Sequence, residues 1–483
     1  MAFLIGGANS ASGGYEVSNS LRFDNPTDDN LAITFGSAGN RRIFTISAWV
    51  KRGLMNDDHA LIGQGGTASG NPRGLIFFDN SFRFTNNTSG SSTDTDVNTN
   101  ALFRDPSAWY HAVAAVDTTQ STAANRVKLY VNGVHQTSLA TATYPDEDFE
   151  MNWNNDVLHT VGRYPAHDGY HMDGYISEFY FIDGTQYAAS DFGETDEDSG
   201  IWKPKAASVT FGDNGFFLEF KQTGTDTDAI GMGADTSGED NHLAVNNLTA
   251  VDVTADTPTN NFATLNPLNN FQGGVLSQGN TSLVTPSSST TPANLNGIVP
   301  ATIGVANGKW YWEVNVTTTN YVAVGIMPSS SSHITYLTPS GSGTRIVKGD
   351  DGIKFSSNSS GGDYMAAYEG SILQVALDMD NGKITFGAGG SWANGSGATN
   401  QTFGNATAAY TDIISSGDYA GEFALPTFSD ENQGTSDTFQ VNFGNPLFAI
   451  SSSNADANGY GNFEYAVPSG YFALCSKNLA EYG

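Results

Sequence analysis

The stretch GKWYWEVNV, Gly308 to Val316, alternates as a β-strand with one apolar face does. Successive side chains of a strand point to opposite faces, so one face carries only apolar residues, namely Trp310, Trp312, Val314 and Val316. Burying a tryptophan removes roughly 150–250 Å² from water, which stabilises a fold by about 4–6 kcal/mol at most. We therefore predict a buried strand with both tryptophans in the core and Tyr311 on the outer face. An aromatic binding platform is the alternative.

The composition around this stretch favours β-structure throughout the chain. Of 483 residues, 55 are Gly and only 14% are charged, while Thr, Ser, Asn and aromatic residues are abundant. This mixture is typical of sheets joined by many turns. At this length we expect more than one domain.

The formal net charge of −30 limits the partners of the chain. A nucleic-acid surface needs clustered Lys and Arg, and only 20 such residues are spread along the sequence, so we expect no nucleic-acid binding. The N-terminal sequence MAFLIGGANSASGGYEV has a short apolar run and no basic flank. We predict neither a secretory signal nor membrane insertion, and we expect residues 1–20 to form an extended arm.

The chain has a single cysteine, Cys475, and therefore no intramolecular disulfide framework. We expect folding in a reducing cytosol. Cys475 itself is predicted to be a small buried residue.

Residues 21–204 contain short apolar runs that are separated by turn residues. The runs are FTISAWVKRG, RGLIFFDNSFRFTN, WYHAVAAVDTT, RVKLYVNGVHQTS and YISEFYFIDG. This spacing predicts an antiparallel sandwich or barrel. The pair Asn132-Gly133 can adopt the two positive φ angles of a type I′ turn, which predicts a hairpin between KLYV and VHQT.

A second set of strands follows a loop-rich segment. Residues 205–260 are predicted to be a connector with one strand at FFLEF, although they could belong to a neighbouring unit. Residues 261–448 contain GKWYWEVNV, NYVAVGIMP, GSILQVALDMDNGKITFGAGG and TFQVNFGNP, with a hairpin signal at Asp380-Asn381-Gly382. Residues 449–483 have no long periodic run. We therefore predict an all-β chain of two successive antiparallel β-sandwiches and no long helix.

Both sets of strands resemble known families. FTISAWVKRG, WYHAVAAVD, VKLYVNGV and DGYISEFYFIDG resemble a LamG-type, concanavalin A-like jelly-roll domain over about residues 21–204. GKWYWEV, VAVGI, LQVALDMDNGKITF and VNFG are similar to a SPRY domain over about residues 261–448. Both families are two-sheet sandwiches that serve as binding scaffolds, and a fold alone does not name a ligand.

The order of these two domains resembles the multidomain structural proteins of tailed bacteriophages. DTPTNNFATLNPL between the domains and PSGYFALCSKNLAEYG at the end contribute to this resemblance. It implies a virion protein, assembled in the host cytoplasm as a homo-oligomer. Such a protein would be a tail fibre or a surface-exposed adhesin that binds host cell-surface glycan, other virion subunits, or both. A capsid-surface decoration or head-fibre protein with purely structural contacts is the alternative.

No catalytic constellation is evident in the sequence. Some relatives of the jelly-roll fold are glucanases, whose catalytic strand carries carboxylates in the order Glu-x-Asp-x-x-Glu. The acidic runs DEDFE, residues 146–150, and ETDED, residues 194–198, have a different spacing and turn-like surroundings. Neither a Gly-x-Ser-x-Gly elbow nor a phosphate-binding Gly-x-x-x-x-Gly-Lys motif occurs. We predict a binding protein with no catalytic residues, and a polysaccharide depolymerase is a second alternative.

Calcium is the one cofactor that the sequence suggests. This ion takes six to eight oxygen ligands and is common at the loops of sandwiches. The candidate ligands are Asp146, Asp148 and Asp173. The alternative for each is an ordinary solvated loop position.

The loop RYPAHDGYHMDG, Arg163 to Gly174, is the richest in polar and aromatic residues. Its two histidines stand four residues apart, as zinc ligands do on a helix, but Pro165 and Gly169 argue against a helix. Aromatic rings stack on sugar faces and polar groups bond sugar hydroxyls. The candidate glycan-binding residues are therefore Arg163, Tyr164, His167, Asp168, Tyr170 and His171. A surface or subunit-contact loop is the alternative.

Overall fold

The computed structural model divides into two compact units, one containing residues 11–259 and the other residues 260–483. The residues that it describes are 14–55, 57–65, 74–88, 94–165, 170–270, 273–286, 296–317, 322–333, 343–356, 359–430 and 436–483. Residues 1–13 of the predicted arm lie outside this set. Apart from one parallel pairing, of residues 472–473 with residues 310–311, the sheets of each unit are antiparallel, so the predicted all-β fold of two successive sandwiches is confirmed.

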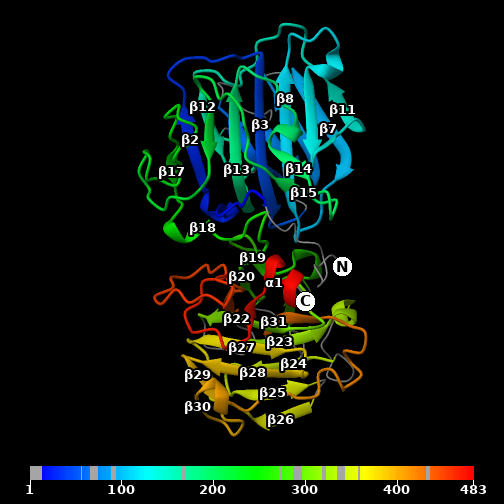
Figure 1. Ribbon diagram of the computed structural model, residues 1–483, viewed down its shortest axis with the longest axis vertical. Helices are drawn as coiled ribbons and strands as arrows, with labels where there is room; N and C mark the ends of the chain where they lie inside the picture. The colour runs from blue at the N-terminus through cyan, green and yellow to red at the C-terminus, as the bar shows by residue number, and fades with distance from the viewer. Residues whose placement is uncertain are drawn as a thin grey trace. The chain divides into compact units, whose positions relative to one another are not determined.

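The first unit is a sandwich of two eight-stranded sheets (Figure 1). One sheet has the order β10-β9-β8-β3-β13-β1-β18, with β16 paired to β13, and the other has the order β11-β7-β6-β5-β4-β12-β2-β17. The strands are β1 (Ser20–Phe23), β2 (Asn30–Thr34), β3 (Ile43–Arg52), β4 (His59–Gln64), β5 (Gly74–Phe78), β6 (Ser81–Asn86), β7 (Thr95–Leu102), β8 (Trp109–Asp117), β9 (Val127–Val131), β10 (Val134–His135), β11 (Leu139–Thr143), β12 (Leu158–Val161), β13 (Gly174–Asp183), β14 (Gly193–Thr195), β15 (Trp202–Pro204), β16 (Phe216–Leu218), β17 (Ala244–Asn246) and β18 (Val253–Thr254). Strands β14 and β15 form a separate hairpin. Short 3₁₀ helices cover Asn25–Thr27, Ala123–Asn125, Ala189–Asp191 and Ala250–Asp252.

Aromatic residues from both sheets and from a loop fill the core of the first unit. Phe44 stacks on Phe181 with ring centroids 6.1 Å apart, and Phe84 stacks on Trp153 at 5.6 Å. The indole N–H of Trp153 donates to the backbone carbonyl of Thr85 at 3.0 Å, so this fully buried ring leaves no polar atom unpaired.

The segment that the sequence predicts as a connector, residues 205–260, instead completes the sheets of the first unit. Strand β16 pairs with β13, β17 pairs with β2, and β18 pairs with β1. Buried ion pairs hold the end of the segment in place, with Arg22 3.2 Å from Asp252 and Lys51 2.7 Å from Asp256. Strand β16 lies within FFLEF, where the sequence predicts a strand, whereas β17 and β18, three and two residues long, are too short to give a periodic signal.

The second unit contains a nine-stranded and a six-stranded sheet. Their orders are β19-β20-β32-β22-β27-β28-β29-β30, with β33 paired to β22, and β21-β31-β23-β24-β25-β26. The elements are β19 (Val275–Ser277), β20 (Ser282–Val284), β21 (Asn296–Pro300), β22 (Lys309–Val316), β23 (Val322–Pro328), β24 (Arg345–Lys348), β25 (Ile353–Ser356), β26 (Ser359–Asp363), β27 (Ile372–Asp378), β28 (Lys383–Ala388), β29 (Ser391–Ala393), β30 (Thr399–Gln401), β31 (Ala424–Asp430), β32 (Thr438–Asn442), β33 (Phe472–Ala473) and the helix α1 (Ser476–Tyr482). Short 3₁₀ helices cover Pro267–Asn269, Ser329–His333 and Phe403–Asn405.

The stretch GKWYWEVNV forms the central strand β22, and both of its tryptophans are fully buried, as predicted. The opposite face of the strand is also covered, because the C-terminal segment, residues 449–483, packs against it. Tyr311 is fully buried and meets the ring of Phe463 edge-on at 5.0 Å. The outer face predicted for Tyr311 is therefore an interior surface, and Cys475 lies buried in the same cluster.

Glu313 is the polar anchor of this C-terminal segment. Its carboxylate accepts the Tyr311 hydroxyl at 2.9 Å and the backbone N–H groups of Glu464 and Tyr465 at 2.9 and 2.8 Å. Burial raises the pKa of Glu313, although each of these hydrogen bonds favours the ionised form. The segment is thus bound to the sheet by charge-assisted hydrogen bonds as well as by apolar contact.

Both predicted hairpin turns are present. Asn132 and Gly133 have φ angles of 47° and 78°, and Val131 pairs with Val134 across the turn. In the second unit Asp378 pairs with Lys383, so Asp380-Asn381-Gly382 lies in the loop between β27 and β28. Asp378 accepts the backbone N–H of Asn381 at 3.0 Å, which is a structural role in the turn.

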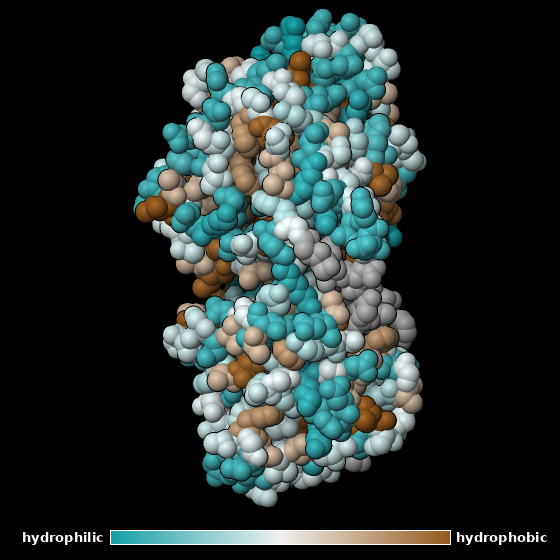
Figure 2. All heavy atoms as spheres, in the orientation of Figure 1, coloured by the Kyte–Doolittle hydropathy of each residue, from teal (hydrophilic) through white to brown (hydrophobic). Residues whose placement is uncertain are grey.

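On the face shown in Figure 2, hydrophobic residues are scattered among hydrophilic ones. The large apolar side chains exposed in the described part of the chain are Leu102, Val134, Leu158, Ile201, Ile230, Leu268, Val275 and Ile414. Within the described residues no helix has the length and apolar character that a membrane crossing requires.

Candidate functional site

A polar pocket of about 360 Å³ opens on the first unit beside strands β2, β12 and β17. Its lining consists of Asp28, Asn30, Ala32, Leu158, Thr160, Arg163, Pro165, Asn246 and Asn247. Side chains alternate between the two faces of a strand, so every second residue of each strand lies on the face of the pocket. The strand register places Thr160 opposite Ala32 and Asn246 opposite Asn30. Three segments distant in sequence therefore present polar side chains to one surface.

The charged wall of the pocket is built around Asp28. Its carboxylate, half exposed to solvent, lies 3.1 Å from Nδ1 of His171 and 3.9 Å from a guanidinium nitrogen of Arg163. A bridge between the backbones of Arg163 and His171 fixes these two side chains as neighbours. Asp28 itself has a φ of 60°, a left-handed conformation that Asp and Asn adopt more readily than most residues.

The asparagine side chains that line the pocket are held by hydrogen bonds to one another and to nearby backbone carbonyls. The Asn246 amide donates to Oδ1 of Asn30 at 3.0 Å, and the Asn30 amide donates to the carbonyl of Asp28 at 2.8 Å. The Asn247 amide donates to the carbonyl of Thr27 at 2.7 Å. The side chains are therefore oriented before any ligand arrives, which lowers the entropy cost of binding.

The structure divides the predicted glycan-binding loop between this pocket and the core. Arg163 lines the pocket and His171 contacts Asp28, whereas Tyr164 is buried against Ala60 and Ile76. Tyr170 packs edge-on against Tyr164 at 6.0 Å. His167 and Asp168 lie outside the described residues.

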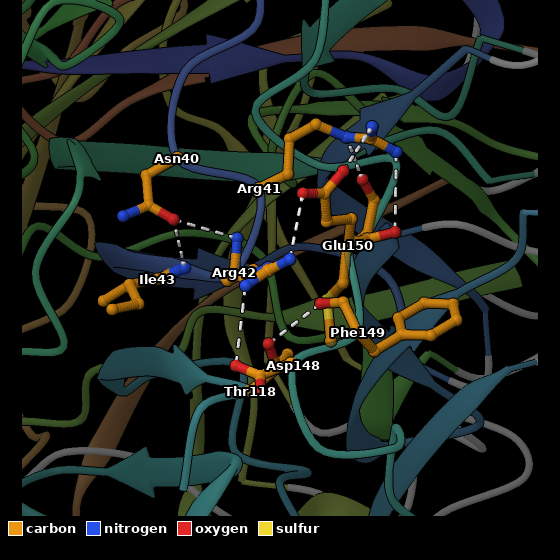
Figure 3. Close-up of polar contacts among 9 residues, drawn as sticks. Asn40, Arg41, Arg42, Ile43, Thr118, Asp148, Phe149 and Glu150 are labelled. Atoms are coloured by element: carbon orange, nitrogen blue, oxygen red, sulfur yellow. Dashed lines mark hydrogen bonds and ion pairs between the residues drawn. The ribbon is translucent and has the colours of Figure 1, made fainter.

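The described residues do not suit a calcium site at the predicted ligands. Asp146 is exposed, and Asp148 lies 3.5 Å from Arg42, which also contacts Glu150 at 3.3 Å (Figure 3). The guanidinium of Arg42 already balances the carboxylates of Asp148 and Glu150. Within the described part of the chain no three His, Cys, Asp or Glu side chains gather as a metal site.

Asp173, the third predicted ligand, is fully buried beside Gly53. Burial, followed by the charge of Asp24, raises the pKa of Asp173 well above its usual value. The backbone N–H groups of Leu54 and Asn25 act in the opposite direction on this pKa, since they donate hydrogen bonds to the carboxylate.

A buried serine–histidine pair also fails as a nucleophile. Ser47 Oγ lies 2.9 Å from Nε2 of His111, and the indole N–H of Trp202 donates to Nδ1 of His111 at 3.1 Å. Because an indole only donates, Nδ1 must accept and Nε2 must carry the proton, so His111 cannot deprotonate Ser47. Burial lowers the pKa of His111 to about 3, which is consistent with a neutral structural residue.

Glu178 is a further buried carboxyl group, at a bulge in β13. Burial raises its pKa to about 7, and the hydroxyls of Tyr15 and Tyr180 both donate to it at 2.9 Å. Only 5% of the residue is exposed, so it is not accessible to a substrate in this arrangement.

Residues 25–189 match the protein-family model Laminin_G_3, described as the concanavalin A-like lectin/glucanases superfamily. Among solved structures, the SPRY domain of human HERC1 is 15% identical with a TM-score of 0.28, over 37% of this chain and 96% of that one. A heptameric SAP-like pentraxin from Limulus polyphemus is 12% identical with a TM-score of 0.29, over 41% of this chain and 91% of that one. No curated protein matches the chain. The first unit thus contains a concanavalin A-like jelly roll, and the matched region includes Asp28, Thr160 and Arg163.

Proposed function

We propose that this chain is a virion protein of a tailed bacteriophage, a tail fibre or surface-exposed adhesin that binds saccharide through the pocket of its first unit. The observation that carries the proposal is the set of oriented amide, hydroxyl, carboxylate and guanidinium groups on a concanavalin A-like jelly roll. The resemblance of the domain order to phage structural proteins supports the virion assignment.

The chemistry of the pocket suits a ligand rich in hydroxyl groups. Carboxylate and amide oxygens accept from sugar hydroxyls, amide and guanidinium N–H groups donate to them, and Leu158 supplies an apolar wall. The strong negative charge of the chain makes a neutral saccharide the favoured class.

The lining also supports binding rather than hydrolysis. Glycosidases use two carboxyl groups that flank the scissile bond, whereas the described lining of this pocket contains one, Asp28. This disfavours the polysaccharide depolymerase.

Asp28→Asn is expected to weaken saccharide binding about tenfold or more, because a charge-assisted hydrogen bond to the ligand is lost. Asn tolerates the left-handed backbone of this position, so the fold should be unchanged. Retention on an array of bacterial surface glycans, followed by calorimetric titration of the retained glycan, measures the effect.

Asp148→Asn is the matched control, since Asp148 is also exposed, also has a φ near 60° (59°) and also pairs with an arginine, but does not line the pocket. Equal affinity losses in the two variants, or no retention of the native chain on any glycan, would contradict the proposed pocket.

The virion assignment predicts that the chain co-purifies with intact phage particles. Antibody labelling in electron microscopy should place it on the tail, whereas labelling of the head would favour the alternative of a decoration or head-fibre protein. Its absence from purified particles would overturn the assignment.

A further inference from the structure

Lys51 and Asp256 form an unusually dry contact in the first unit. Nζ of Lys51, on the central strand β3, lies 2.7 Å from Oδ2 of Asp256, and the two side chains are 1% and 0% exposed. The residues are 205 positions apart in the chain. The carboxyl carbon, one bond beyond Oδ2, is therefore within reach of the amine nitrogen.

Aromatic groups surround this contact. The indole N–H of Trp109 donates to the other carboxylate oxygen, Oδ1 of Asp256, at 3.1 Å. Nζ of Lys51 also lies 5.6 Å from the centre of the Tyr175 ring, which packs in one cluster with Trp49 and Trp109. These rings form a low-dielectric environment around the amine and the carboxylate.

Such an environment favours the neutral form of the amine. Burial lowers the pKa of Lys51, while the charges of Asp256 and Asp105 act in the opposite direction. A neutral amine is the nucleophilic form of lysine, and a neutral carboxylic acid is the form of aspartate that can lose water.

We propose that Lys51 and Asp256 join through an intramolecular amide, an isopeptide bond that cross-links β3 to the end of the first unit. A proton passes from Nζ to Oδ2, the nitrogen attacks Cγ, the C–N bond forms and the C–Oδ2 bond breaks. Two of the three ammonium protons leave with Oδ2 as one water, and the third remains on the amide nitrogen. The Trp109 N–H stabilises the negative charge that develops on Oδ1.

The chain has a single cysteine and forms no intramolecular disulfide, and this amide would be a covalent cross-link in its place. It ties the last strands of the first unit to a central strand and closes a loop of 205 positions, which restricts the unfolded chain. The inference is independent of what the pocket binds.

Mass spectrometry of the denatured full chain tests the proposal. The native chain is expected to be lighter than its sequence by about 18 Da, the mass of one water. Because trypsin does not cut after an acylated lysine, tryptic digestion should yield a branched peptide that joins residues 43–52, with Lys51 inside, to the segment containing Asp256. A full sequence mass, or Lys51 in an ordinary linear peptide, would overturn the proposal.

Lys51→Arg provides the decisive variant, because a guanidinium keeps the ion pair but does not form the amide. Its mass should equal that of its own sequence, and its melting temperature should fall by roughly 10–20 °C. Lys203→Arg is the matched control: Lys203 lies 2.9 Å from Asp196 in a more exposed pair, and this variant should retain the water loss.

Cyclisation of an Asp-Gly step, such as Asp173-Gly174, also removes one water. Hydroxylamine cleaves such a cyclic imide and leaves an amide intact, so persistence of the mass deficit after treatment separates the two. If Lys51→Arg does not fold, the native mass and the branched peptide still decide the question.

Discussion

Replacing Trp312 with Ala should destabilise the chain by about 3–5 kcal/mol, the range for truncation of a large buried aromatic residue. Trp312 is fully buried on β22, and its ring lies 6.2 Å from that of Phe443. Neighbours held in a two-sheet core cannot collapse into the space that the indole leaves. Urea unfolding of the full chain measures the loss.

Two conservative variants separate the contribution of the buried ring to stability from that of the indole N–H group. The indole nitrogen of Trp312 has no hydrogen-bond partner among the described residues, whereas that of Trp310 donates to the carbonyl of Asn307 at 2.7 Å. Trp310→Phe should therefore cost about 1–3 kcal/mol more than Trp312→Phe. An unchanged stability of Trp312→Ala would instead favour the aromatic binding platform.

Glu313→Ala should cost a similar amount, about 3–5 kcal/mol, by a different mechanism. The change leaves the Tyr311 hydroxyl and the N–H groups of Glu464 and Tyr465 buried without their acceptor. The C-terminal segment should then open locally. Hydrogen exchange or limited proteolysis should detect faster opening within residues 449–483 than in β22 and β27.

Glu313→Gln keeps one acceptor oxygen and should retain most of the stability. The raised pKa of Glu313 gives this pair of variants a second readout. Stability linked to this group is fully present below the pKa of the unfolded chain and declines as the pH rises through the higher pKa of the folded chain. Glu313→Gln should remove that decline, and identical pH profiles for the two proteins would contradict the assigned role.

The sequence predicts well those elements whose signal is local. Strands such as β3, β22 and β27 are seven to ten residues long and alternate clearly, and Asn132-Gly133 can form only a narrow set of turns. The two sandwiches and the burial of both tryptophans follow from these local patterns.

What the sequence does not predict depends on pairing between distant segments. Strands β17 and β18 are too short to show a period, and nothing local to Tyr311 indicates that residues 449–483 cover it. The pocket arises in the same way, since Asn30, Thr160 and Asn246 meet only through the register of β2, β12 and β17. The sequence places Tyr164 in a binding loop because its packing against Ala60 of β4 and Ile76 of β5 is not visible along the chain.

The closing pairs of the first unit join its earliest strands to its latest ones. Strand β1 pairs with β18, and the Ser20 hydroxyl lies 2.7 Å from that of Thr254, 234 positions later. During synthesis β1 and β2 therefore each keep one edge unpaired until residues 244–256 have left the ribosome. A fragment that stops at residue 204 would lack β16, β17 and β18, so the compact unit needs the chain to about residue 259.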